Sequence, residues 1–166
     1  MKDLIFIGGA KGVGKSTLVE KLRTYFSINV INTGEFFIQA RENGLNYDQE
    51  ISEYLKNKHR GLVDTHYAGY QGNGFVRGIS REGLLAIKSL KTIELVLIDL
   101  DLQTLLKRRE KDKRIGRELD AVHAQIELGM NRLYFDEYSK DLLTPGVIIK
   151  NINLDEAFSS LLKALK

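Results

Sequence analysis

The sequence predicts a three-layer α/β domain in which a five-stranded parallel sheet carries helices on both faces. Three observations support this prediction. Apolar runs of strand type alternate with segments of helical spacing, which is typical of parallel sheets. A complete phosphate-loop motif follows the first apolar run. The length of 166 residues fits one domain, which we expect to span residues 1–166.

The strands and helices follow from the order of these segments. The expected strands are 4–7, 28–32, 61–65, 93–98 and 147–149. The expected helices are about 17–26, 36–43, 48–58, 81–90, 102–109, 120–143 and 155–165. The longest one is predicted to be amphipathic, with an apolar stripe of Val122, Ile126, Met130, Leu133 and Tyr134 at helical spacing.

A glycine-rich segment, residues 66–78, lies between the third strand and the next helix and contains Tyr67, Tyr70 and Phe75. Connections of this length without regular structure are uncommon in compact domains and are usually functional or disordered. The aromatic residues argue against disorder. We expect a binding loop, because the segment leaves the carboxyl end of a strand. A tolerated insertion is the alternative.

The strongest signal is the G-x-x-x-x-G-K-S motif, placed between a strand and a helix. Its glycines let the backbone approach a polyphosphate, and successive N–H groups form an anion-binding nest at the start of the helix. Lys15 can reach the β- and γ-phosphates, and the Ser16 hydroxyl can ligate Mg²⁺. The predicted nucleotide-binding residues are Gly9, Ala10, Lys11, Gly12, Val13, Gly14, Lys15, Ser16 and Thr17.

Further polar residues follow the other strands. A ligand of an open α/β sheet lies at the carboxyl ends of the strands, so Thr33, Gly34, Asp64 and His66 are expected beside the phosphate loop. Asp64 is a candidate for organising magnesium, with a capping or turn aspartate as the alternative. His66 is a candidate phosphate contact, with a packing role as the alternative. Asp99, with Asp101, is expected to cap the next helix instead.

Positive charge is concentrated between residues 107 and 117, where seven basic residues accompany two acidic ones. Catalysis of phosphoryl transfer consists of positioning and charge neutralisation, and the planar fork of arginine suits a phosphate group. Candidates are Arg108, Arg109, Arg114 and Arg117. The alternative is a solvated surface run, which is what we expect of the lysines. A general nucleic-acid binder spreads its positive charge over a face, so RNA binding is not expected.

The amino-acid composition excludes several classes of protein and of metal site. The chain has no cysteine, which excludes disulfides and thiolate-held zinc, and its three histidines do not share a metal-ligand spacing. No signal peptide or run of membrane-spanning length is visible. We expect a cytoplasmic protein without a membrane partner.

Several segments resemble the archaeal type of adenylate kinase, within the nucleoside monophosphate kinases. The similar segments are GGAKGVGKST at 8–17, INTGE at 31–35, VDTH at 63–66, GYQGNG at 69–74, LVLIDLDLQTLLKRRE at 95–110 and RELDAVHAQIELGMNRLYFDEY at 117–138. Together they span nearly the whole chain in the same order. The resemblance implies an enzyme that transfers the γ-phosphoryl group of MgATP to AMP or a related monophosphate, and often a homo-oligomer.

The resemblance also implies roles for residues, carried over by position. A short lid would lie at about 111–119 and the acceptor-binding region at about 33–80. ATP would be held by residues 9–17 with Arg108. The implied catalytic residues are Lys15, Asp64, Arg109 and Arg117. The acceptor would contact Thr33, Gly34, Arg41 and His66. Magnesium would be held by Ser16, and by Asp64 through water.

Two alternatives stay open. The first is a P-loop kinase that phosphorylates another monophosphate or a small hydroxylated metabolite. The second is an NTP-hydrolysing switch or assembly factor that acts on RNA or on a protein partner.

Overall fold

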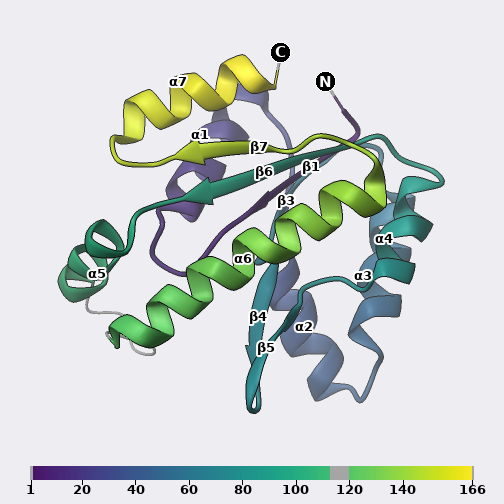
Figure 1. Cartoon of the computed structure of the whole chain (residues 1–166). Helices are drawn as coiled ribbons and strands as arrows, with labels where there is room; N and C mark the ends of the chain where they lie inside the picture. Colours follow the sequence, from purple (N-terminus) through teal and green to yellow (C-terminus); the bar gives the residue numbers. More distant parts are fainter. Residues whose placement is uncertain (1, 113–119, 166) are drawn as a thin grey trace.

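The computed structural model describes residues 2–112 and 120–165. Its main sheet contains β1 (Leu4–Gly8), β2 (Val30–Asn32), β3 (Gly61–Asp64), β6 (Ile93–Asp99) and β7 (Val147–Lys150). The strand order is β2-β3-β1-β6-β7, and every neighbouring pair is parallel. The predicted α/β class with a five-stranded parallel sheet is confirmed (Figure 1).

Helices cover both faces of this sheet, and alternate residues of β1 divide the core between them. Ile5 and Ile7 pack with residues of α1 (Lys15–Phe26) and α7 (Leu154–Ala164). Leu4 and Phe6 pack with α3 (Tyr47–Asn57), α4 (Arg81–Lys88) and α6 (Ala121–Leu142). Residues on both faces of β1 are buried, as expected for the central strand of a parallel sheet.

The remaining helices are α2 (Thr33–Glu42) and α5 (Leu102–Lys111). Helix α2 begins at Thr33, three residues earlier than predicted. The reason is an N-cap: Asn32 Oδ1 accepts hydrogen bonds from Gly34 N at 2.9 Å and Glu35 N at 3.4 Å. The carboxyl end of β2 therefore passes directly into a helix.

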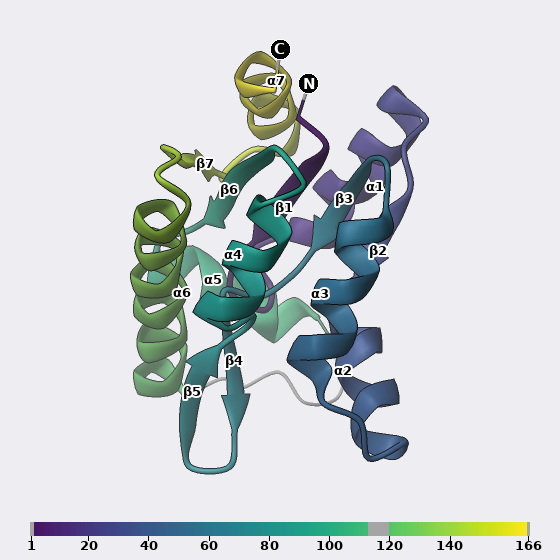
Figure 2. The same ribbon diagram turned by 90° about the vertical axis from the view of Figure 1, so that its right-hand side faces the viewer.

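The expectation that residues 66–78 lack regular structure was wrong. The segment contains an antiparallel hairpin of β4 (Ala68–Gln71) and β5 (Gly74–Arg77). Gly72 lies at its turn with φ +57°, the left-handed conformation that a tight two-residue connection requires. Glycines within and between such short strands conceal the alternation that normally marks a hairpin. Figure 2 shows this hairpin between α6 on one side and α2 and α3 on the other.

The apolar stripe predicted for α6 was wrong for three of its five residues, although Tyr134 packs against the core. Val122, Ile126 and Leu133 are 68%, 48% and 49% exposed. The buried face instead carries Ala124, Glu127, Leu128, Asn131, Phe135, Tyr138 and Leu142. Two polar residues, Glu127 and Asn131, interrupt this face and obscure its helical period in the sequence. Both have hydrogen-bond partners, which makes their burial tolerable.

Candidate functional site

The phosphate loop joins β1 to α1, and its backbone requires glycine. Gly9, Gly12 and Gly14 have φ values of +154°, +92° and +88°. A Cβ at Gly9 would lie 2.3 Å from Ile98 O, and one at Gly14 would lie 2.3 Å from Asn151 Nδ2. The loop ends at the start of α1, whose first N–H groups have no intrahelical acceptor. The arrangement is an anion-binding nest followed by a helix N-terminus.

Two side chains brace the loop from its far side. Val13 O accepts hydrogen bonds from Asn151 Nδ2 at 2.7 Å and from Arg108 Nη1 at 3.1 Å. Arg108 Nη2 also donates to Asn151 O at 2.5 Å. Arg108, the candidate for binding ATP phosphates, thus lies beside the loop and donates to backbone carbonyl groups. Asn151 was missed by sequence reasoning, because a lone asparagine after the last strand carries no signal.

A second pair of side chains holds the other end of the loop. Arg109, which is 2% exposed, donates to Lys11 O from Nε at 3.0 Å and from Nη2 at 2.7 Å. Glu127 accepts a hydrogen bond from Lys11 N at 2.7 Å and forms an ion pair with Arg109 at 2.6 Å. Glu127 was also missed in the sequence. The predicted catalytic arginine is therefore placed at the loop, where it binds the backbone and a carboxylate.

Lys15, the first residue of α1, lies next to Asp64, the last residue of β3. In the register of β1 and β3, Asp64 lies opposite Ile7, just before the loop begins. Lys15 Nζ forms an ion pair with Asp64 Oδ1, and both side chains are largely buried. Ser16 is exposed in the first turn of α1. A hydroxyl and a carboxylate beside a phosphate nest are oxygen ligands of the kind that Mg²⁺ prefers, so these residues fit a magnesium nucleotide.

His66 connects this group to the loop. Its Nδ1 lies 2.7 Å from Gly9 O, and a carbonyl only accepts, so Nδ1 carries the hydrogen. Burial and the positive charge of Lys15 lower the pKa of His66 to about 3, so the ring is neutral at physiological pH. Nε2 is then a hydrogen-bond acceptor. His66, the candidate phosphate contact, thus lies beside the loop as a neutral ring.

A cavity of about 210 Å³ opens next to the loop. Its lining combines Lys11, Arg109 and Glu127 with α2, α3, the hairpin and the start of α6. The residues are Lys11, Thr33, Gly34, Phe37, Tyr47, His66, Ala68, Gly69, Tyr70, Gln71, Phe75, Val76, Arg77, Gly78, Arg109, His123 and Glu127. Of the predicted acceptor residues, Thr33, Gly34 and His66 line it. Arg41 is exposed on α2 and does not.

Aromatic rings form one end of this cavity. The ring centroids of Tyr70, Phe75 and His123 are 5.2 to 5.3 Å from one another, which joins the hairpin to α6. Phe37 and Tyr47 meet edge to face at 5.5 Å on the side of α2 and α3. Burial raises the pKa of Tyr47 to about 12, so its hydroxyl stays protonated and available as a donor.

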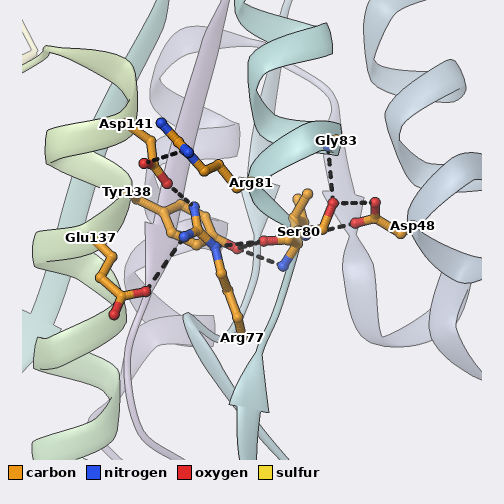
Figure 3. A network of polar contacts seen from close by, with 9 residues as sticks. Asp48, Arg77, Ser80, Arg81, Gly83, Glu137, Tyr138 and Asp141 are labelled. Atoms are coloured by element: carbon orange, nitrogen blue, oxygen red, sulfur yellow. Dashed lines mark hydrogen bonds and ion pairs between the residues drawn. The ribbon is translucent and has the colours of Figure 1, made fainter.

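A polar network anchors the base of the hairpin to α6 and α3 (Figure 3). Arg77 donates to Ile79 O at 2.9 Å and pairs with Asp141 of α6 at 2.6 Å. Tyr138 Oη accepts from Ile79 N at 2.5 Å, and Ser80 N donates to Asp48 of α3 at 2.7 Å. The cavity wall formed by the hairpin is therefore fixed to α3 and α6.

The other predicted residues are placed as follows. Asp101 caps α5 by accepting from Thr104 N at 2.9 Å, as expected. Asp99 is buried and pairs with Arg132 and Lys150, so it supports the sheet and does not cap the helix. Arg114, Arg117 and nearly all of the predicted lid at 111–119 lie outside the described residues. Among the described residues, no group of three or more His, Asp or Glu could hold a metal ion.

The nest, the paired Lys15 and Asp64 and the parallel sheet define a P-loop nucleotide-binding domain with a kinase-like fold. A family model described as an AAA domain (AAA_17) matches residues 8–125, which is more than half of the chain. The chain therefore belongs to this AAA domain family. A comparison with curated proteins found no match.

Solved structures show the same fold at low identity. YorR from Bacillus subtilis, in complex with phosphorylated GDP, has a TM-score of 0.72 at 16% identity, covering 98% of this chain and 95% of its own. Shikimate kinase from Aquifex aeolicus has a TM-score of 0.63 at 18% identity, with coverage of 98% and 95%. Shikimate kinase from Acinetobacter baumannii, in complex with shikimate, has a TM-score of 0.61 at 17% identity, with coverage of 98% and 93%. In the part of the chain that the structure describes, no helix combines the length and apolar content needed to cross a membrane.

Proposed function

We propose that this protein is a nucleoside monophosphate kinase that transfers the γ-phosphoryl group of MgATP to AMP, giving two ADP. The observation that carries the proposal is the position of the cavity. Lys11, Arg109 and Glu127 belong both to the surroundings of the phosphate loop and to the lining of the cavity. A molecule in the cavity would therefore lie next to the terminal phosphate of a nucleotide on the loop.

In this proposal the residues of the loop bind and orient the donor. The N–H groups at Gly12 to Thr17 hold the phosphates, and Lys15 leaves Asp64 to contact the β- and γ-phosphates. Ser16, with Asp64 through water, would hold Mg²⁺, which supplies charge neutralisation on the phosphate oxygens. Arg109 and Arg117 are the proposed arginines for the transferred group, with Arg117 on a lid at about 111–119.

The cavity residues would bind the acceptor. Thr33, Gly34 and His66 lie at the loop side, and the aromatic rings lie farther out. A flat nucleobase suits those rings, because aromatic faces stack on planar groups. The neutral Nε2 of His66 would accept a hydrogen bond from a donor group of the acceptor.

A different small-molecule acceptor is a second candidate, and one observation favours it. The two arginines in the cavity lining already pair with carboxylates: Arg77 with Glu137 and Asp141, and Arg109 with Glu127. A phosphate on the acceptor would compete with these carboxylates for the two arginines. A hydroxylated acceptor without phosphate, as in the shikimate complex of the Acinetobacter enzyme, would not.

One assay separates these candidates. MgATP is incubated with AMP, the other nucleoside monophosphates, nucleosides and shikimate, and the products are separated by chromatography. We expect two molecules of ADP to form for each molecule of AMP consumed, one from ATP and one from AMP. Phosphorylation of a nucleoside or of shikimate alone would support the second candidate. Release of inorganic phosphate without any acceptor product would favour an NTP-hydrolysing switch.

A further inference from the structure

Glu127 connects the phosphate loop to an arginine from another helix. One carboxylate oxygen binds Lys11 N, the other binds Arg109, and Arg109 binds Lys11 O. Three residues from the loop, α5 and α6 thus form a closed ring of hydrogen bonds. Both polar backbone atoms of Lys11 are held by it. A shift of Glu127 would therefore move the loop and Arg109 together.

The ring of hydrogen bonds is buried, so the loss of one of its members destabilises the others. The Glu127 side chain is 7% exposed and that of Arg109 is 1% exposed. A pair of buried charges is stable only when each has its partner, and removal of one partner leaves an uncompensated charge. Exposed ion pairs on the same protein, such as that of Arg23 with Glu20, carry no such penalty.

The helix that carries Glu127 also carries the wall of the cavity. One turn beyond it, Asn131 Oδ1 accepts a hydrogen bond from Ala68 N, at the start of the hairpin, at 3.2 Å. Farther along, Tyr138 binds Ile79 just after the hairpin. Helix α6 thus holds the phosphate loop through Glu127 and the acceptor side through Asn131 and Tyr138.

We propose that Glu127 is a positioning residue that fixes Lys11 and Arg109 against each other and so sets the donor loop relative to the acceptor cavity. The part of this inference that concerns turnover rests on the proposed kinase function. The part that concerns the loop does not, because nucleotide binding can be measured without an acceptor.

The test replaces Glu127 with glutamine. In Glu127→Gln the amide oxygen can still accept a hydrogen bond from Lys11 N. The side chain then turns its neutral NH₂ group toward Arg109, where the native protein has a negatively charged oxygen. Glu20→Gln is the control, because the Glu20 carboxylate also pairs with an arginine, Arg23, but the pair is exposed and Glu20 is not part of the cavity lining. For each variant, the dissociation constant of a non-hydrolysable ATP analogue with Mg²⁺ is measured by calorimetry, and kcat and KM are measured with ATP and AMP. Circular dichroism and thermal unfolding verify the fold.

We expect Glu127→Gln to weaken analogue binding and to lower kcat by about tenfold or more each, the size typical of a lost charge-assisted hydrogen bond. Glu20→Gln should stay within about twofold of the native protein, as is typical of exposed pairs. Native affinity and turnover in a folded Glu127→Gln protein would overturn the inference, and so would equal losses in the control. If Glu127→Gln does not fold, Glu127→Asp keeps the charge but withdraws it by one methylene, and the same comparison applies.

A double-mutant cycle with Arg109→Ala provides a readout that general destabilisation would not reproduce. Because both residues act through one ring, the double variant should lose no more kcat than the worse single variant. Additive losses would contradict the ring. If AMP is not phosphorylated at all, the kinase proposal fails, while the analogue affinities still decide the role of Glu127.

Discussion

Gly14 allows a worked prediction, because its surroundings define two separate costs for an added methyl group. Its φ of +88° is a left-handed conformation, which costs a residue with a Cβ about 1–2 kcal/mol. The Cβ would also lie 2.3 Å from Asn151 Nδ2, so the Asn151 amide would have to leave Val13 O. A lost buried hydrogen bond adds about 1–3 kcal/mol. We expect Gly14→Ala to destabilise the protein by about 3 kcal/mol, or about 6–12 °C in Tm.

Gly72→Ala is the control for the backbone cost alone. Its φ is +57°, and an added Cβ there would have no atom within 4 Å. Its expected loss is about 1 kcal/mol, or about 2–4 °C in Tm. Calorimetric unfolding of both variants, together with the affinity for an ATP analogue, tests the reasoning. Binding should weaken only in Gly14→Ala, and adding Asn151→Ala should recover part of its Tm. Equal Tm losses in the two variants with unchanged affinity would refute the steric argument.

Three further predictions concern the site. Lys15→Ala should lower kcat by a factor of about 10²–10³, because it removes one electrostatic donor from a site that excludes water. Circular dichroism should show an intact fold. Near-native turnover would contradict a role of Lys15 in phosphoryl transfer. Arg117→Ala should lower kcat more than it weakens ATP binding, and a changed salt dependence of RNA binding with unchanged turnover would argue against a lid. The folded pKa of His66, about 3, lies below its ordinary 6.5, so protonation favours the unfolded chain. His66 should thus contribute stability above about pH 6.5 that declines toward pH 3. His66→Asn should flatten this part of the stability profile, and an unchanged profile would contradict a neutral His66.

The sheet was predictable because its strands are short apolar runs with clear boundaries. The phosphate loop was predictable because its glycines and Lys15 occur in a fixed local pattern. The hairpin was missed because Gly69 and Gly74 take up positions in strands of only four residues. A strand that short has too few side chains for its alternation to be recognised. Most of the fold was therefore predictable from local patterns in the sequence.

The supports of the loop were not predictable from local patterns. Glu127 and Asn151 contact residues 116 and 138 positions away in the sequence. Each is a common polar residue without a motif around it, and only the folded chain brings it to the loop. Arg108 and Arg109 were recognised as residues for phosphate, but their contacts with the backbone of the loop depend on how α5 is docked. Their proposed roles with substrate stay predictions.

The residues that brace the phosphate loop are synthesised after the loop itself, in the order of the sequence. During synthesis the complete glycine motif emerges first, since it ends at Thr17. Arg109 and Glu127 follow only after most of the sheet, and Asn151 comes after the last strand. A nascent or truncated chain that ends before β7 would carry the whole motif but would lack the amide that holds Val13 O. Val13 O would then keep the hydrogen bond from Arg108, and we expect nucleotide affinity to rise once Asn151 is in place.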